Sequence, residues 1–172
     1  MQLHIANNLV QLPKISPQSL LEDIYEKNLS EDEHLREHTL RLMSLIYSNL
    51  GNNQKAIAFA KEALDLCIKN YGGEHIETLN AKYNLATCYS NAGQYDNAIE
   101  LGKEAYELGI KYSAPRKILI MNDIASNYYN LDDYKSGMYW AKKAVDESIS
   151  TLGEKDILTL GSQNTLSNFY IT

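Results

Sequence analysis

Large hydrophobic residues recur along the chain at helical spacing and in long units. Tyr47, Tyr89, Tyr128 and Tyr170 are separated by 42, 39 and 42 residues. Four positions before each tyrosine stands a large apolar residue, and a small residue comes directly after it, as in Leu85-Ala86. Residues four apart lie on one face of an α-helix. The pattern therefore predicts a helix that ends shortly after each tyrosine.

A turn and a second helix are predicted after each of the first three tyrosines. The turn residues stand four positions later and are Gly51, Gly93 and Asp132. Glycine ends a helix because it enters the left-handed conformation freely. Small residues then recur at three matched places in each unit: Ala56, Ala60 and Ala63; Ala98, Gly102 and Ala105; Gly137, Ala141 and Ala144. This stripe lets a neighbouring helix approach closely, so each unit is predicted to be an antiparallel helical hairpin.

A second repeated segment supports the alignment of the units. Residues 72–79 (GGEHIETL) and 153–160 (GEKDILTL) align at an offset of 81 residues. We predict helices at 17–28, 33–49, 54–70, 75–91, 95–111, 116–130, 134–150 and 156–171, with a short one at 3–11. Ser16 and Pro17 mark the start of the first long helix, as a hydroxyl cap and a first-turn proline. The predicted fold class is all-α.

These units resemble the tetratricopeptide repeat (TPR), a helix pair with the same spacing of leucine, tyrosine, glycine and alanine. The 42-residue period and the segment from Gly72 to Tyr89 are similar to the kinesin-light-chain type. The resemblance implies a right-handed α-solenoid of antiparallel helix pairs. Its parts would be an N-terminal cap or degenerate half-repeat (1–32), three repeats (33–73, 74–113 and 114–152) and the first helix of an incomplete fourth repeat (153–172). It also implies that the first helix of each pair lines a concave, peptide-binding surface.

Composition narrows the range of partners. The 22 acidic and 16 basic residues give a net charge of −6, which argues against binding to nucleic acid or to an anionic membrane surface. No apolar run is long enough to span a bilayer, and the N-terminus lacks a signal-peptide pattern. Cys67 and Cys88 are too few for a disulfide framework and are expected to be small core residues. The expected location is cytoplasmic.

One segment matches a catalytic pattern. His34-x-x-Glu37-His38 places two imidazoles on one helical face, as in the inverted zinc-binding motif of metal-dependent hydrolases. No third ligand is evident nearby, and the segment falls at the start of a repeat helix that packing already explains. No phosphate-binding glycine loop, nucleophile elbow or Cys/His cluster occurs in the sequence. We therefore expect no enzyme activity, metal or cofactor, and a hydrolase is only a minor alternative.

The candidate peptide-binding residues lie on the inner side of the first helices, off the packing stripe. They are Arg41, Leu45 and Asn49; Asn80, Tyr83, Asn84 and Thr87; Asn122, Asp123 and Ser126; Asn164 and Asn168. Asparagine is a poor helix former, so its recurrence here has two interpretations. Either the amides bind a peptide backbone, or they reflect the asparagine richness of the whole chain. Kinesin-light-chain-type repeats use asparagines at places that match Asn84.

The charges on this surface favour one class of peptide. A carboxylate clamp needs several cations and amides from adjacent first helices. Arg41 and Asn84 fit that pattern, but Leu45, Leu119 and Asp123 stand where it needs Asn, Lys and Arg. A neutral or mildly basic peptide is therefore expected.

The last predicted helix, 156–171, is unusually apolar for the end of a solenoid, where a polar face is normal. Its large apolar residues are Ile157, Leu160, Leu166, Phe169, Tyr170 and Ile171. Either the chain is part of a longer array, or this helix mediates self-association. The expected function is a non-catalytic protein–protein interaction scaffold. The alternative is a regulatory or sensor region of a larger signalling protein.

Overall fold

The computed structural model describes Ser19, Asp23 and residues 33–112 and 116–170. All elements in these residues are helical, which confirms the all-α prediction. They are α2 (Glu33–Asn49), α3 (Asn53–Tyr71), α4 (Ile76–Asn91), α5 (Tyr95–Lys111), α6 (Arg116–Asn130), α7 (Tyr134–Leu152), α8 (Ile157–Ser167) and the 3₁₀ helix η1 (Asn168–Tyr170). None of these helices is long and apolar enough to cross a membrane.

The observed helices follow the predicted ones closely. The ranges 33–49, 95–111 and 116–130 are helical with the predicted bounds, and three others differ by one or two residues at an end. The helix predicted at 156–171 is instead α-helical only from Ile157 to Ser167 and then tightens into η1. Such 3₁₀ turns are frequent at helix termini. The helices predicted at 3–11 and 17–28 lie outside the described residues, apart from Ser19 and Asp23.

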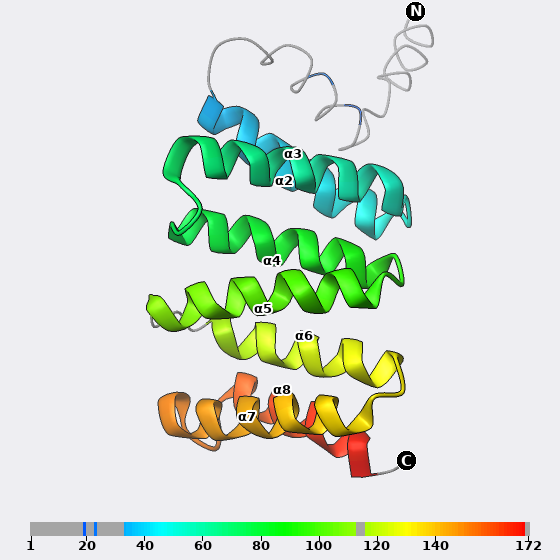
Figure 1. The fold of residues 1–172 in the computed structure, drawn as a ribbon, viewed down its shortest axis with the longest axis vertical. Helices are drawn as coiled ribbons and strands as arrows, with labels where there is room; N and C mark the ends of the chain where they lie inside the picture. The colour runs from blue at the N-terminus through cyan, green and yellow to red at the C-terminus, as the bar shows by residue number, and fades with distance from the viewer. Residues whose placement is uncertain (1–18, 20–22, 24–32, 113–115, 171–172) are drawn as a thin grey trace, which may run out of the picture.

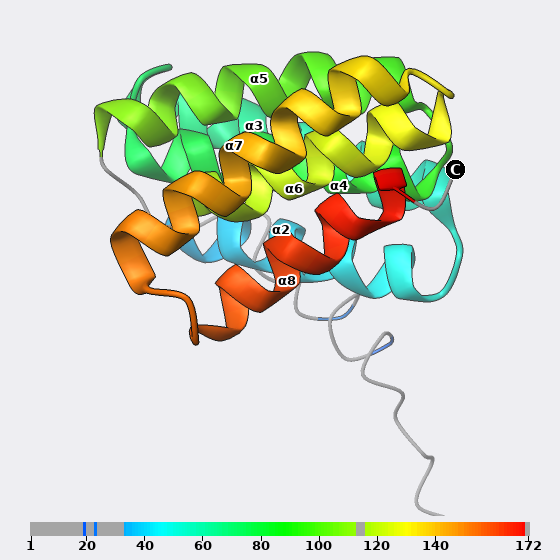
Figure 2. The ribbon, with the colours of Figure 1, turned by 90° about the horizontal axis from the view of Figure 1, so that it is seen from below.

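The helices stack in two layers along one long axis (Figures 1 and 2). The first layer holds α2, α4, α6 and α8, and the second holds α3, α5 and α7. Each helix packs on its neighbours in sequence, and successive helices of the first layer also pack on one another. Comparable packing within the second layer is not found among the described residues. Since the first-layer helices stand closer together, the stack curves with that layer on its concave side.

The turns between first and second helices use the predicted residues. Gly51 and Gly93 both have φ of 73°, and Asp132 has φ of 59°. Glycine adopts this left-handed conformation at no steric cost, and aspartate tolerates it because its short side chain can bond locally. The Tyr134 hydroxyl donates to Oδ1 of Asp132 over 2.8 Å, so this hydrogen bond supports the one turn without a glycine.

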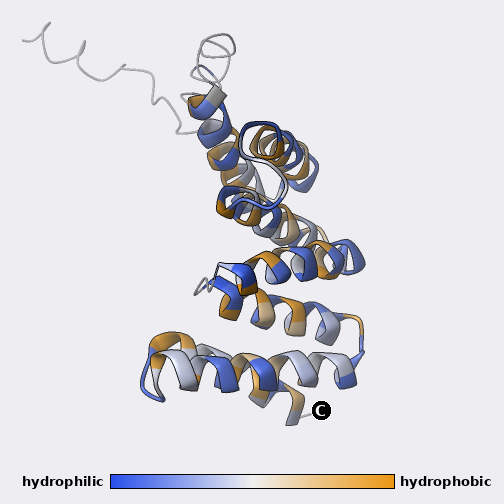
Figure 3. Cartoon of the chain, turned by 60° about the vertical axis from the view of Figure 1, so that its left-hand side comes forward, coloured by the Kyte–Doolittle hydropathy of each residue, from blue (hydrophilic) through white to orange (hydrophobic). Residues whose placement is uncertain are grey.

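The stripe of small residues is buried along its whole length. All nine predicted members, from Ala56 to Ala144, are buried on the second helices. Large residues of the first helices pack against them, as Met43 and Tyr47 do against Ala56 and Ala60. Figure 3 shows hydrophobic positions alternating with hydrophilic ones along each helix. Packing of large against small residues therefore sets the spacing of the helix pairs and, with it, the concave surface.

The four repeated tyrosines do not share one environment. Tyr47 is buried and Tyr89 and Tyr128 are half-buried, but Tyr170 is 65% exposed. The matched spacing of the four tyrosines on their helices predicts a core position for each of them, and this prediction is wrong for Tyr170. The reason is that no second helix follows α8 among the described elements. Phe169 is buried instead, where its ring contacts α7 at Gly137.

Candidate functional site

A groove of about 360 Å³ opens on the concave side, mainly between α2 and α4. It is lined by His38, Arg41, Leu42 and Leu45 of α2, by Asn80, Tyr83, Asn84 and Thr87 of α4, and by Arg116 of α6. The α2 and α4 residues recur at intervals of three and four, so one face of each helix supplies them. The structure thus brings together six of the twelve candidate residues: Arg41, Leu45, Asn80, Tyr83, Asn84 and Thr87.

The groove has an apolar wall that faces solvent. Leu42 and Leu45 expose 51% and 52% of their surface. Tyr83 is half-buried, and the Arg116 guanidinium lies 5.4 Å from the centroid of its ring. This cation–π contact holds a planar, charged group beside the aromatic ring. The groove therefore offers contacts to an apolar side chain and to a polar one at the same time.

Arg41 is held by two carboxylates. Its Nη1 atom lies 3.1 Å from Oε1 of Glu37 and 3.1 Å from Oε2 of Glu77. The Asn80 amide also donates to Glu77, over 3.4 Å. A peptide carboxylate at Arg41 would have to compete with both acids. This arrangement agrees with the expectation that the groove is not a carboxylate clamp.

Two of the candidate asparagines connect neighbouring first helices. The Asn84 amide donates to the Ser44 hydroxyl over 2.7 Å, and the Asn122 amide donates to the Ser162 hydroxyl over 2.9 Å. Each bond joins residues 40 positions apart, close to the length of one repeat. These bonds give a third reason for asparagine on this surface, beside peptide binding and composition: the amide links one repeat to the next.

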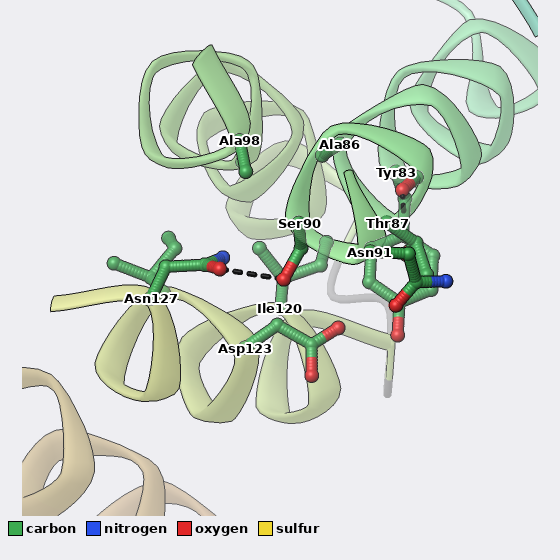
Figure 4. Close-up of a pocket in the computed structure, with 11 residues that line it drawn as sticks. Tyr83, Ala86, Thr87, Ser90, Asn91, Ala98, Ile120, Asp123 and Asn127 are labelled. Atoms are coloured by element: carbon green, nitrogen blue, oxygen red, sulfur yellow. Dashed lines mark hydrogen bonds between the residues drawn. The ribbon is translucent and has the colours of Figure 1, made fainter. Parts of the chain in front are cut away.

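A smaller cavity of about 110 Å³ lies among α4, α5 and α6 (Figure 4). Tyr83 and Thr87 line both this cavity and the groove. The candidate Asp123 lines the cavity, where burial raises the pKa of its carboxyl group and a hydrogen bond from Tyr83 opposes that rise. The Ser90 hydroxyl donates to Oδ1 of Asn127 over 2.6 Å. The cavity therefore extends the polar side of the groove toward α6.

The remaining candidates lie away from the groove. Ser126 and Asn168 line a third cavity, where α6 meets the end of α8 and η1. Asn49 and Asn164 are exposed.

Three of the nine groove residues, His38, Leu42 and Arg116, are not among the twelve candidates. Leu42 stands five positions before Tyr47, as the candidate Asn84 stands five before Tyr89. His38 stands nine positions before Tyr47, as Asn80 stands nine before Tyr89, so the repeat alignment already contained the signal for it. Arg116 has no such signal, because the aligned residues are Leu35 and Glu77. Its position in the groove depends on how α6 packs against α4, which the sequence pattern does not reveal.

The His34-x-x-Glu37-His38 segment is not arranged as a metal site. Nδ1 of His34 lies 2.7 Å from the Tyr71 hydroxyl, whereas His38 lines the groove. Glu37 is only 1% exposed and is ion-paired with Arg41. In residues 33–112 and 116–170, no group of three or more His, Cys, Asp or Glu side chains could hold a metal ion. The hydrolase alternative therefore has no geometric support in this part of the chain.

Both cysteines are buried and unoxidised. Burial, followed by the nearby Glu37 carboxylate, raises the pKa of the Cys67 thiol to about 12. Burial raises the pKa of Cys88 to about 11. The thiolate is the reactive form of cysteine, and little of it exists at neutral pH with such values. Cys67 and Cys88 are thus core residues, as the sequence predicts.

Part of the chain matches a known family in sequence, and the chain as a whole resembles solved structures in fold. Residues 35–111 match the family model of the tetratricopeptide repeat. A Podosopora anserina protein with nearly identical TPR-like repeats of the kinesin-light-chain kind has a similar structure, with a TM-score of 0.75 at 22% identity. That match covers 88% of this chain and 75% of the other. A search of curated proteins finds no match.

Two further solved structures share the fold. BtubC from P. vanneervenii gives a TM-score of 0.75 at 20% identity, and the match covers 87% of this chain and 64% of that protein. RapI in its apo form gives a TM-score of 0.70 at 16% identity, and the match covers 83% of this chain and 39% of RapI. At these identities the similarity establishes the fold alone.

Proposed function

We propose that this chain, whose residues 35–111 match the tetratricopeptide repeat, binds a short segment of a partner protein in the groove between α2 and α4. The observation that carries the proposal is the groove itself. Six residues selected from sequence alone line it together, and its two leucines, Leu42 and Leu45, are half exposed. Repeats of this family generally serve as non-catalytic scaffolds for protein–protein interaction, and the groove supplies a surface for that role.

The chemistry of the groove indicates what the segment contains. Leu42, Leu45 and Tyr83 offer contact to an apolar side chain, and one such anchor can supply much of the affinity. His38, Arg41 and Arg116 line the groove together with polar groups, while Glu77 and Asp123 lie beside it. Because both signs of charge are present, the proposed segment is close to neutral and carries an apolar anchor residue.

The test is a selection of short peptides from a displayed library on the wild-type chain, followed by affinity measurements with two groove variants. Leu45→Asp places a charge on the apolar wall, and Arg116→Glu reverses the charge beside Tyr83. Both side chains are exposed, so the fold should tolerate these changes. Each variant is expected to bind the selected peptides at least tenfold more weakly, which is about 1.4 kcal/mol.

Tyr139→Ala is the matched control. Tyr139 is 61% exposed and belongs to α7 in the second layer. This variant is expected to bind the peptides as the wild type does. Peptides with equal affinity for the wild type and all three variants would show that the groove is not the binding site.

A further inference from the structure

The cavity among α4, α5 and α6 shares part of its wall with the groove (Figure 4). Tyr83 and Thr87 of α4 line both spaces, and both side chains are half-buried. The volume of the cavity, about 110 Å³, is several times the roughly 10–15 Å³ that one water molecule needs. A side chain of a segment that lies in the groove can therefore enter the cavity past Tyr83 and Thr87.

Among the described residues that line the cavity, only Asp123 carries a charge. Ala86, Ile120 and Ile124 belong to its apolar wall and are buried. The Ser90 hydroxyl donates to Oδ1 of Asn127, and Figure 4 shows the Asp123 carboxylate outside this bonded pair. Asp123 therefore determines which charge a ligand in the cavity should carry.

The Asp123 carboxylate has a tyrosine as a partner but no cation. Burial raises the pKa of this carboxyl group, and a hydrogen bond from Tyr83 opposes the rise. In residues 33–112 and 116–170, no lysine, arginine or histidine is ion-paired with Asp123. The Arg116 guanidinium lies over the Tyr83 ring instead. Because a partly buried carboxylate without a cation is costly, a ligand that brings a cation is favoured.

Two other acids near the groove are already paired. Glu37 and Glu77 each have a carboxylate oxygen 3.1 Å from Nη1 of Arg41. A cation of a bound segment would have to compete with Arg41 at those acids. At Asp123 it has no charged competitor among the described residues.

The repeat itself does not require an acid at this position. The residues five positions before the four repeated tyrosines are Leu42, Asn84, Asp123 and Thr165. The same place on a first helix is thus occupied by an apolar, an amide, an acidic or a hydroxyl side chain. The packing of the helix pairs therefore does not account for the carboxylate of Asp123.

A lysine fits the cavity better than an arginine does. The ammonium group of lysine is compact, and its four-carbon stem can lie along apolar surface, which Ala86 and Ile120 supply. The planar fork of arginine binds best to both oxygens of one carboxylate. Tyr83 already donates a hydrogen bond to the Asp123 carboxylate, so a single-point contact is the better match.

We propose that the cavity among α4, α5 and α6 is a lysine subsite, in which Asp123 binds the ammonium group of one lysine of the segment held in the groove. This inference rests on the proposed function, because the groove holds the rest of the segment. It adds that the segment carries a lysine at a fixed distance from its apolar anchor. One lysine also keeps the segment close to neutral.

The first experiment compares peptides selected from one displayed library on three proteins: the wild type, Asp123→Asn and Asp146→Asn. Asp123→Asn removes the charge and keeps the shape of the side chain. Asp146→Asn is the matched control, because Asp146 is exposed on α7 and lines neither the groove nor the cavity. Peptides from the wild type and the control are expected to share the lysine, and those from Asp123→Asn are expected to lack it. Thermal midpoints no lower than that of the wild type would show that both variants fold.

The second experiment changes the lysine of the tightest wild-type peptide. Norleucine in its place is expected to weaken binding to the wild type by about tenfold, and binding to Asp123→Asn by about twofold at most. The two effects differ because the ion pair is already lost in the variant. Arginine in its place is expected to bind the wild type several-fold more weakly than lysine does.

The third experiment tests the cavity without any peptide. n-Butylamine has the length and charge of a lysine side chain, and n-butanol is its neutral counterpart. In NMR titrations of the methyl-labelled chain, n-butylamine is expected to shift the Ile120 methyl signal at lower concentration than n-butanol does. Asp123→Asn should abolish this difference, and Asp146→Asn should preserve it.

Selected peptides that lack a shared lysine, or that keep it on Asp123→Asn, would overturn the inference. If such peptides still lose affinity with Leu45→Asp, the proposed function stands without the subsite. If the wild type selects no peptide, the proposed function fails, and the titrations alone decide on the cavity. In that case an equal response to n-butylamine and n-butanol would overturn the lysine subsite.

Discussion

At the residue scale, the inner asparagines join neighbouring helices as well as facing the concave side. The Asn84–Ser44 and Asn122–Ser162 bonds each link one first helix to the next. Asn91 adds a similar bond to Ser48, over 2.8 Å. A residue with poor helix propensity thus stands where its amide reaches a hydroxyl of the neighbouring first helix.

This role predicts that Asn84 contributes to stability. Asn84→Ala is expected to lower the free energy of unfolding by about 1 kcal/mol, the usual contribution of one hydrogen bond. Adding Ser44→Ala should cost less than the sum of the two single changes, since both remove the same bond. Urea unfolding of the four proteins measures this coupling. Strictly additive losses would show that the amide acts elsewhere.

Gly137 is a second position where the surroundings require a particular residue, because they leave no room for a side chain. A Cβ at this position would lie 2.5 Å from Cε1 of Phe169 and 3.1 Å from the carbonyl oxygen of Ala125. Gly137→Ala is therefore expected to destabilise the protein by about 1–3 kcal/mol, as overpacked cores do. Phe169→Leu in the same chain should recover part of the loss because the smaller side chain leaves room. If Gly137→Ala unfolds at the wild-type urea concentration, this close contact is absent in solution.

At the element scale, corresponding helices begin with the same geometry but different residues. Asn52 caps α3 at φ −85° and ψ 72°, and Asp133 caps α7 at φ −85° and ψ 69°. Each side chain accepts a hydrogen bond from the backbone N–H three residues later. His75 caps α4 and Asp156 caps α8 in a corresponding way, because each side chain accepts a hydrogen bond from the backbone N–H two residues later. Asn52 and Asp133 therefore make the same kind of cap with nearly the same backbone geometry, and they differ in that Asp133 can carry a charge.

Of these two caps, only the one made by Asp133 is expected to contribute a stability that depends on pH. Hydrogen bonds from Ser136 lower the pKa of the Asp133 carboxyl, so its stabilisation is present above the ordinary aspartate pKa. It is lost as the pH falls through the lowered value. The loss of thermal midpoint caused by Asp133→Ala should therefore shrink in acid. The loss caused by Asn52→Ala should persist at all pH values, and equal behaviour of the two variants would contradict this account.

At the scale of the whole molecule, each helix pair is stabilised mainly by its neighbours. The largest core cluster joins residues of α4, α5, α6 and α7, whereas the cluster at η1 has only three buried members. A solenoid opens where its helices have fewest neighbours. Amide hydrogen exchange is therefore expected to be slowest in α4, α5 and α6 and fastest in α8 and η1. Uniform protection along the stack would contradict this ranking.

The sequence predicts most of this architecture because the signals for its helices, turns and close contacts occur several times along the chain. The nine small residues, the turn at Asp132 and three sets of helix bounds follow from a pattern that recurs in each unit. The exposure of Tyr170 does not follow, because its environment depends on the helix that comes next. Arg116 is missed for a similar reason: its place in the groove is set by contacts between repeats. The division into repeats and the role of each groove residue remain predictions.

The most direct test of the central claim is to map where a selected peptide binds on the isotopically labelled chain by NMR. The account predicts shifts of amide and side-chain signals from α2, α4 and the start of α6, centred on Leu45, Tyr83 and Arg116. Signals from the second-layer helices α3, α5 and α7 should stay in place. Shifts concentrated in that second layer would contradict the assignment of the concave groove as the binding surface.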